Sequence, residues 1–220
     1  SKILNINRGN RFVSLTSTAT KARGFAAAAE KRGWAGTGGH RVFNKGDVVT
    51  TVIKCANGEV VTLKHCVSLP RPYSRDCRVQ GTKGLWLEDA KGIFIEGFSK
   101  VEEVGPPGGT WHVEKWDPVD SYYEQHDHPL WKRFRDNVTG GHGGMDTLVV
   151  QAFFDAVRHR APTPIDVYDC AAWMSITCLS EESIAMGSAP VPVPDFTNGK
   201  WIKREPERET PWMLSEIYKG

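Results

Sequence analysis

The sequence lacks the features that most directly reveal a binding partner. Lys and Arg (28) nearly balance Asp and Glu (26), so the formal net charge is only +2. Such a balance supplies no strong basic field to attract nucleic acid or an anionic membrane. No stretch approaches the roughly 18 consecutive apolar residues of a membrane helix, and no signal peptide is visible. We therefore expect neither nucleic acid nor a membrane as a partner.

The cysteine and glycine patterns exclude two further classes of site. The five cysteines are odd in number and form no C-x-x-C pair, so neither a zinc site nor a dense disulfide framework is expected. No G-x-G-x-x-G follows a predicted strand, and no P-loop is present. We expect no metal site and no nucleotide-binding domain in these 220 residues.

What is present is the composition of a globular domain. Hydrophobic residues make up 40% and charged residues 25%, and 220 residues can bury a core without disulfides. We expect residues 1–220 to form a single domain. The chain starts with Ser rather than Met, and its first six residues are typical of the end of a helix already under way. We therefore expect the chain to begin within a longer protein.

Apolar and β-branched residues predict an antiparallel meander. Its clearest part is a hairpin of strands 48–55 and 60–69, joined at Asn57-Gly58. Asn and Gly tolerate the positive φ that a type I′ turn needs at both positions. Residues 36–39 are predicted to be a loop. Further strands are predicted at residues 12–18, 76–80, 85–88 and 93–96.

Helices are predicted mainly in the second half, at residues 20–32, 127–136, 146–159 and 165–185. Gly24 weakens the first, Asp146 is the predicted cap of the third, and Gly187 closes the last. The Pro-rich tail after Ser188 is expected to wrap the surface as extended chain. Strands first and helices later indicate an α+β fold, with one open, mainly antiparallel sheet and helices packed on one face.

A stiff loop follows the predicted hairpin and carries Tyr73. Its residues 69–75 read Leu-Pro-Arg-Pro-Tyr-Ser-Arg, and Pro70 and Pro72 fix the backbone. A stiff loop at a strand end suits a side chain that must hold one position. Tyr73 is thus a candidate to hydrogen-bond a substrate hydroxyl or to assist a proton transfer. The alternative, which the residues alone favour, is a surface aromatic that closes a turn between two arginines.

A glycine-rich run at residues 140–146 surrounds His142. Its four glycines allow close approach of the backbone to another group, and the run opens a helix whose N-terminus favours an anion or a polar oxygen. His142 is a candidate ligand or acid–base group. The alternative, weighted equally, is a connection that packs tightly against the sheet.

Other histidines are interpreted as structural. His126-Asp127-His128 offers metal-ligand types without a third spaced ligand. A helix start with Asp127 as cap and Pro129 near the first helical position explains these residues better. His65 shares a strand face with apolar residues, which favours a sheet or core histidine. The residues alone therefore leave two candidate polar loops and no identified reaction.

Six short runs also match a known family in order. They are NINRGNRF at 5–12, LPRPYSR at 69–75, DHPLW at 127–131, HGGMD at 142–146, YDCAAW at 168–173 and PDFT at 194–197. Each run is weak alone, but the ordered set is specific and resembles glycoside hydrolase family 109 over nearly the whole chain.

The resemblance implies a Rossmann domain followed by an open-sheet domain of the oxidoreductase C-terminal type. It also implies removal of terminal α-linked N-acetylgalactosamine with a tightly held NAD. In that reaction NAD takes hydride from C3 of the sugar, a base removes the C2 proton, and the group at C1 is eliminated. Water then adds and the hydride returns. The paired carboxylates of ordinary glycosidases are not needed, because the cofactor performs the difficult step.

Only part of the family's site falls on this sequence. The loop tyrosine that contacts the sugar matches Tyr73, and His142 matches a family motif without an assigned role. Both are candidate substrate-binding residues. The resemblance places a Tyr/His motif and the NAD fingerprint upstream of Ser1. We therefore expect the NAD-binding domain to be absent and this chain alone to be inactive. Its expected partners are a carbohydrate and its own Rossmann domain, and the family implies export or the periplasm.

Two alternatives stay open. A sugar dehydrogenase of the same superfamily would share the fold but release oxidised sugar, and the upstream Tyr/His motif would separate the two. A non-catalytic carbohydrate-binding or assembly module would bind sugar weakly, without an effect of NAD. Pairing of open sheets between subunits would make such a module a homo-oligomer.

Separation from the Rossmann domain predicts self-association of this chain. The sheet face that would meet that domain should leave an apolar patch larger than the few hundred Å² usual for a monomer. We expect homo-oligomers in sedimentation velocity runs at high protein concentration without detergent. Sedimentation as a monomer throughout would contradict this expectation.

Overall fold

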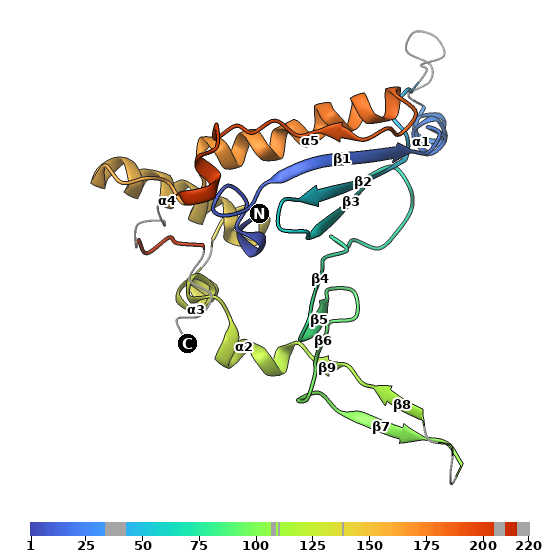
Figure 1. The fold of residues 1–220 in the computed structure, drawn as a ribbon, viewed down its shortest axis with the longest axis vertical. Coiled ribbons are helices and arrows are strands. Elements are labelled where there is room, and N and C mark those ends of the chain that lie inside the picture. The colour runs from blue at the N-terminus through green and yellow to red at the C-terminus, as the bar shows by residue number, and fades with distance from the viewer. Residues whose placement is uncertain (34–42, 107–108, 110, 138, 205–209, 215–220) are drawn as a thin grey trace. The chain divides into compact units, whose positions relative to one another are not determined.

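The computed structural model describes residues 1–33, 43–106, 109, 111–137, 139–204 and 210–214. The loop predicted at residues 36–39 lies outside these residues. The chain divides into two compact units (Figure 1). The first comprises Ser1–Pro70 and Phe134–Gly220, and the second comprises Arg71–Arg133.

A four-stranded antiparallel sheet, ordered β10-β1-β2-β3, forms the centre of the first unit. Its strands are β1 (Phe12–Ala19), β2 (Val48–Cys55), β3 (Val60–Cys66) and β10 (Val191–Pro192). The strands predicted at 12–18 and 48–55 are confirmed, whereas β3 ends three residues before its predicted end. The tail after Ser188 does more than wrap the surface. Its Val191 and Val193 are buried, because β10 pairs with β1.

The hairpin of β2 and β3 is confirmed, but its turn is not type I′. Gly58 has a φ of 99°, whereas Asn57 is not among the residues with positive φ. The Gly58 N–H donates to the Cys55 carbonyl, and the Cys55 N–H donates to that of Glu59. Four residues, 56–59, therefore connect the strands. This longer loop requires only one left-handed residue, which Gly58 provides without a Cβ clash.

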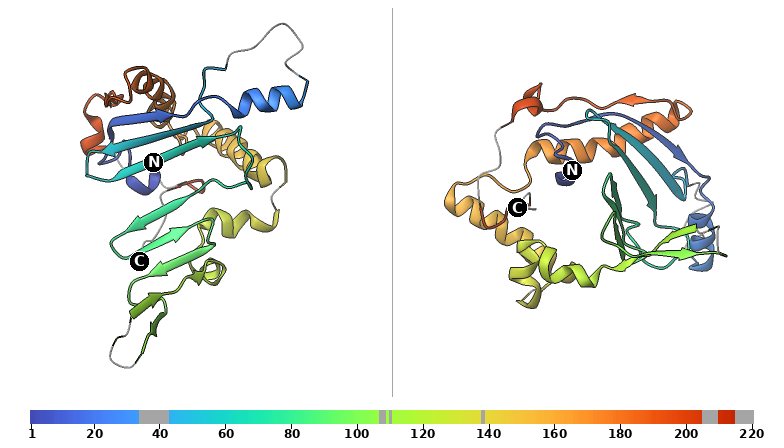
Figure 2. Two further views of the ribbon diagram at one scale, coloured as in Figure 1. Left: turned by 90° about the vertical axis from the view of Figure 1, so that its right-hand side faces the viewer. Right: turned by 60° about the horizontal axis from the view of Figure 1, so that its bottom comes forward.

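Three longer helices belong to the first unit: α1 (Gly24–Lys31), α4 (Met145–His159) and α5 (Val167–Ala185). All three were predicted, with starts that differ by one to a few residues. Helix α5 packs along β1 (Figures 1 and 2). It starts with a capping box, in which the Asp166 carboxylate accepts the Asp169 N–H (3.0 Å) and the Asp169 carboxylate accepts the Asp166 N–H (3.3 Å). Among the described residues of this unit are also the short 3₁₀ helices η1 (Lys2–Leu4), η3 (Arg135–Asn137), η4 (His142–Gly144) and η5 (Lys200–Lys203).

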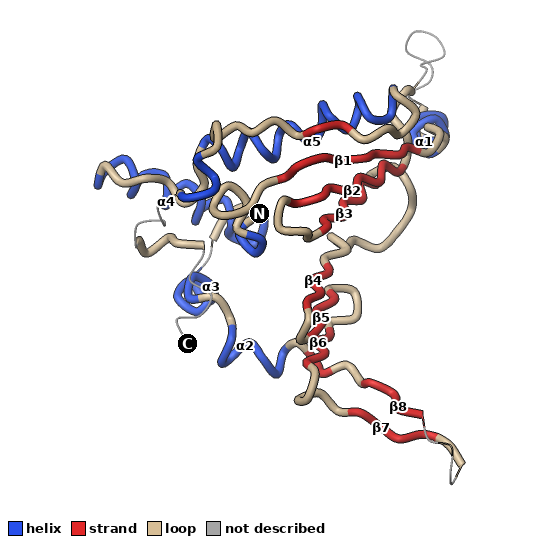
Figure 3. Tube along the Cα trace, viewed as in Figure 1, coloured by secondary structure: helices blue, strands red, loops and turns tan. Residues whose placement is uncertain are grey.

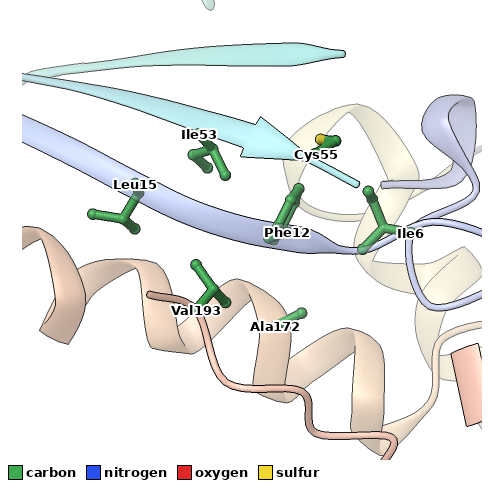
Figure 4. Packing of buried hydrophobic residues seen from close by; sticks show 7 residues of the cluster. All are labelled: Ile6, Phe12, Leu15, Ile53, Cys55, Ala172 and Val193. Atoms are coloured by element: carbon green, nitrogen blue, oxygen red, sulfur yellow. The ribbon is translucent and has the colours of Figure 1, made fainter. Parts of the chain in front are cut away.

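Buried side chains between the sheet and α5 form the core of the first unit (Figure 4). They are Ile6, Phe12, Leu15, Ile53, Cys55, Ala172 and Val193. Burial of each large apolar side chain contributes about 1.5–3 kcal/mol. Because Ile6 precedes the sheet and Val193 follows α5, the core closes only when both ends of the unit are in place.

A buried ion cluster joins those two ends to α5. Both guanidinium ends of Arg8 contact the fully buried Asp169, with Nη1–Oδ1 at 2.8 Å and Nη2–Oδ2 at 2.9 Å. Arg8 also reaches Asp166 Oδ2 at 3.1 Å, and Arg204 contacts that same oxygen. Burial pushes the Asp169 pKa upward, but the hydrogen bonds and charge of Arg8 outweigh burial and hold the pKa below its ordinary value.

The second unit consists of strands with little helix (Figure 3). Strands β4 (Arg78–Gly81), β5 (Gly84–Leu87), β6 (Gly92–Ile95) and β9 (Asp117–Pro118) form one antiparallel sheet, and β7 (Val101–Val104) pairs with β8 (Trp111–Glu114). The predicted meander of β4 to β6 is confirmed. Strands β7 to β9 and helix α2 (Asp120–His126) were not predicted. The Asp117 carboxylate on β9 links α2 to the segment that precedes β7. It accepts hydrogen bonds from Tyr122 OH (2.8 Å) in α2 and from Ser99 Oγ (2.6 Å) before β7.

The helix predicted at 127–136 is shorter than expected and capped differently. Helix α3 spans Pro129–Phe134, followed by η3. His128, not Asp127, satisfies the helix start, because its ring Nδ1 accepts the Leu130 N–H (3.1 Å). Asp127 instead accepts the N–H of His128 (2.9 Å). The prediction of Pro129 at the first helical position is confirmed.

The fold is α+β with open, mainly antiparallel sheets, as predicted. The expectation of one sheet is wrong, because the strands of the described residues form three. Pro70 and Pro72 lie between β3 and β4 and have no N–H to donate to a ladder, so pairing does not continue from one strand to the next. No helix among the described residues is long and apolar enough to cross a membrane.

Removal of the buried charge should destabilise the chain strongly. Asp169→Asn removes the buried carboxylate that both guanidinium ends of Arg8 contact and leaves Arg8 its contact with the more exposed Asp166. We expect the free energy of unfolding to fall by about 3–5 kcal/mol in urea titrations near neutral pH. Arg158→Met is the matched control. It breaks the exposed Arg158–Asp155 pair (4.0 Å), so a change of only about 0–1 kcal/mol is expected.

The same carboxylate predicts the direction of a pH effect. A pKa that is lower in the folded state than in the unfolded state contributes stability above about pH 4, and this contribution is lost as pH falls through the folded pKa. The wild-type chain should therefore lose more stability between neutral and acidic pH than Asp169→Asn. Parallel acid profiles of the two chains would contradict the assignment.

Candidate functional site

Tyr73 lies on the loop that opens the second unit and is 85% exposed. Its hydroxyl oxygen accepts a hydrogen bond from Arg75 Nε at 3.2 Å. This hydrogen bond raises the pKa of Arg75 further above its ordinary value. Because the oxygen is already an acceptor, the hydroxyl hydrogen of Tyr73 can donate outward to a ligand.

Side-chain contacts brace the Tyr73 loop from both sides. The Arg71 guanidinium donates to the carbonyls of Pro72 (3.4 Å) and Ser74 (3.0 Å). Ser74 Oγ donates to Asp89 and accepts the N–H of Asp76 at 2.8 Å. The loop is thus held by hydrogen bonds as well as by its prolines, as a mount for one exposed phenol requires.

His142 lies in the first unit, within η4 and directly before α4. Its Nδ1 lies 2.9 Å from Oδ2 and 3.1 Å from Oδ1 of Asp146. An ionised carboxylate can only accept, so Nδ1 carries the proton when the ring is neutral and Nε2 is left as an outward acceptor. The His142 side chain is 77% exposed. The arrangement can bind a donor such as a hydroxyl or accept a proton.

Close contacts with the first turn of α4 explain the glycines around His142. A Cβ on Gly141 would lie 2.5 Å from Asp146 Oδ2, and one on Gly140 would lie 2.6 Å from Thr147 Oγ1. The close approach is therefore to side chains of α4. The predicted cap was wrong: Gly144, with a φ of 90°, is the N-cap, and Asp146 lies inside the helix, where it contacts His142.

The helix N-termini of the first unit do not fit a dinucleotide phosphate. Asp47 accepts the N–H groups of Arg23 (2.8 Å) and Gly24 (2.7 Å) at the start of α1. Asp146 lies in the first turn of α4, and Asp166 caps α5. Each carboxylate supplies the negative charge that a pyrophosphate would otherwise bring to a helix N-terminus. These three helices therefore do not offer a site for NAD.

Three other histidines of the described ranges have structural contacts. His128 caps α3, and the His126 ring lies 6.0 Å from that of Tyr122. His65 lies on β3 as a sheet residue, but it is exposed, and its Nε2 lies 2.6 Å from Lys45 Nζ. Within the described ranges, no three His, Cys, Asp or Glu side chains are grouped so that they could hold a metal ion.

The residue patterns alone did not predict the pairing of His142 with Asp146 or the bracing of Tyr73 by Arg71 and Arg75. The first had a readable signal, since residues four apart meet on one side of a helical turn. The second had none, because the contacts depend on how the loop folds. Tyr73 belongs to the second unit and His142 to the first.

Comparison with known proteins agrees with these motifs. Residues 1–203 match the family described as glycosyl hydrolase 109, C-terminal domain. An alpha-N-acetylgalactosaminidase of Tannerella forsythia is 47% identical over 205 residues, which are 92% of this chain and 41% of that protein. A glycosyl hydrolase family 109 protein of Parabacteroides distasonis is 42% identical over 206 residues, 93% of this chain and 42% of that protein.

A more distant relative matches this chain over a similar length. The alpha-N-acetylgalactosaminidase of Shewanella oneidensis is 36% identical over 212 residues, covering 94% of this chain and 44% of that protein. The chain thus spans less than half the length of these curated relatives. Because the family match covers nearly all of it, the chain belongs to glycosyl hydrolase family 109, where it corresponds to the C-terminal domain.

Proposed function

We propose that this chain is the substrate-side domain of a glycosidase that removes terminal α-linked N-acetylgalactosamine. The match of residues 1–203 to the C-terminal domain of the family carries the proposal. Relatives named alpha-N-acetylgalactosaminidase support the choice of sugar.

Tyr73 is the residue that we assign to sugar binding. Its exposed hydroxyl sits on a braced loop, and Arg75 occupies its oxygen as donor. The hydroxyl hydrogen can then be donated to a hydroxyl or acetamido oxygen of the sugar. His142 is the second candidate, because its Nε2 can accept from a sugar hydroxyl while Asp146 fixes the ring.

The proposed enzyme uses NAD, held by the part of the longer protein outside this chain. The proposed reaction is the oxidation, elimination, water addition and reduction that the family resemblance implies. No step of that reaction is assigned to the residues of this chain. This chain would bind and orient the sugar, and alone it would be inactive.

The decisive test is an assay of the full-length gene product with a chromogenic α-N-acetylgalactosaminide, with and without added NAD. Release of the chromophore that depends on NAD is the expected result. Oxidised sugar without release would favour the dehydrogenase. A full-length product that leaves this sugar unchanged, with or without NAD, would overturn the glycosidase proposal.

Tyr73→Phe in the full-length enzyme removes the donated hydrogen bond and leaves the ring. Loss of one neutral hydrogen bond of about 0.5–1.5 kcal/mol lowers kcat/KM about 2- to 10-fold. Tyr123→Phe, another exposed tyrosine of the second unit, is the matched control and should retain the wild-type value. Equal kcat/KM for Tyr73→Phe and wild type would remove Tyr73 from the site.

Asp146→Ala tests whether the carboxylate orients His142. Without Asp146, the neutral imidazole should shift from the Nδ1–H form to the Nε2–H form that an unpaired imidazole prefers. The tautomer can be measured from the ¹⁵N shifts of the labelled chain. Asp155→Ala, on the same helix, should leave the His142 signals unchanged. An Nε2–H tautomer in the wild-type chain would contradict the assignment.

A further inference from the structure

Helix α4 turns its larger apolar side chains away from the first unit. At about 3.6 residues per turn, one side of the helix is buried or half-buried and carries Met145, Leu148, Ala152 and Ala156. The other side carries the residues that we call the α4 face: Val149, Val150, Phe153, Phe154 and Val157. Their exposed fractions are 50–65%. A globular helix usually buries its larger apolar stripe, so the α4 face is suited to a second contact.

A hollow of about 340 Å³ adjoins the α4 face. Its lining comprises Phe134, Gln151, Phe154, Asp155, Arg158 and Trp212. Trp212 is fixed there, because its ring stacks on Phe134 with centroids 5.2 Å apart and its Nε1–H donates to Asp155 Oδ2 at 2.9 Å. Aromatic walls with a polar rim resemble the pockets that receive anchor side chains at protein interfaces.

The chemistry of the α4 face favours a protein as its occupant. Its five side chains offer no hydrogen-bond donor or acceptor, whereas sugar hydroxyls need both. A helix that lies on a membrane carries Lys and Arg along its polar side. Here the described polar side of α4 mixes Asp155 with Arg158 and Gln151.

We propose that the α4 face, rather than the sheet face expected from the sequence, is the docking surface for the N-terminal part of the longer protein. This inference rests on the proposed function, which places the cofactor domain outside this chain. The chain covers only 41–44% of its relatives and matches their C-terminal domain, so more than half of each relative lies outside it. A domain tethered in the same polypeptide has a high effective concentration, so it covers an apolar face without waiting for a diffusing partner.

Photo-cross-linking of the full-length protein tests the proposal. A benzophenone amino acid replaces Phe153 in one variant and Val60 in a control. Val60 is also an exposed apolar residue of the first unit, but it lies on β3. Genetic incorporation is preferred to cysteine labelling, since Cys170 and Cys178 are exposed thiols. The protein is a mixture of ¹⁵N-labelled and unlabelled copies, so mass spectrometry separates contacts within one copy from contacts between copies.

The expected main product joins position 153 to a peptide that precedes Ser1 in the same copy, and this product is absent for position 60. Cross-links to residues 71–133 would show that the second unit covers the α4 face, and mixed-isotope cross-links would show that a second copy does. Either result overturns the proposal, as does the absence of any cross-link at position 153. The readout does not depend on sugar hydrolysis, so an enzyme silent on N-acetylgalactosamine could still cross-link as expected.

Discussion

The buried contact between Arg8 and Asp169 is the interaction on which the first unit depends. It joins residues 161 positions apart in the sequence, and Asp166 extends it to Arg204. The segment before β1, the start of α5 and the chain after β10 therefore meet at one charged cluster. Because Asp169 is fully buried, its charge is tolerated only when Arg8 and the Asp166 N–H are in position. The cluster thus specifies where α5 begins relative to β1.

The apolar core next to this cluster shows the same requirement for both chain ends. Ile6 and Val193 pack with residues of β1, β2 and α5, so neither the sheet nor the helix completes the core alone. The second unit has a smaller polar cluster, in which the Asp117 carboxylate accepts hydrogen bonds from the hydroxyls of Ser99 and Tyr122. Charge and hydrogen bonding therefore position elements that have little apolar area to bury.

Local patterns in the sequence predicted what depends on neighbours in the chain. Strand β2 and the end of α5 agree with the structure because β-branched residues and Gly187 act locally. The division into three sheets and the addition of β10 to β1 depend on pairing between distant segments, which periodicity does not report. The same limit applies to the site. Tyr73 and His142 were recognisable as unusual residues, but their partners Arg75 and Asp146 follow from the folded loops.

The described part of the chain offers side chains suited to binding a sugar and helix N-termini that are already occupied. Carboxylates already occupy the N-termini of α1, α4 and α5, and the exposed phenol and imidazole can bind or orient a sugar without breaking a bond. No single motif of such a domain identifies its family, whereas the motifs taken in order do. The outward α4 face fits the proposed function, because a domain that binds the sugar would have to be fixed against the proposed cofactor domain.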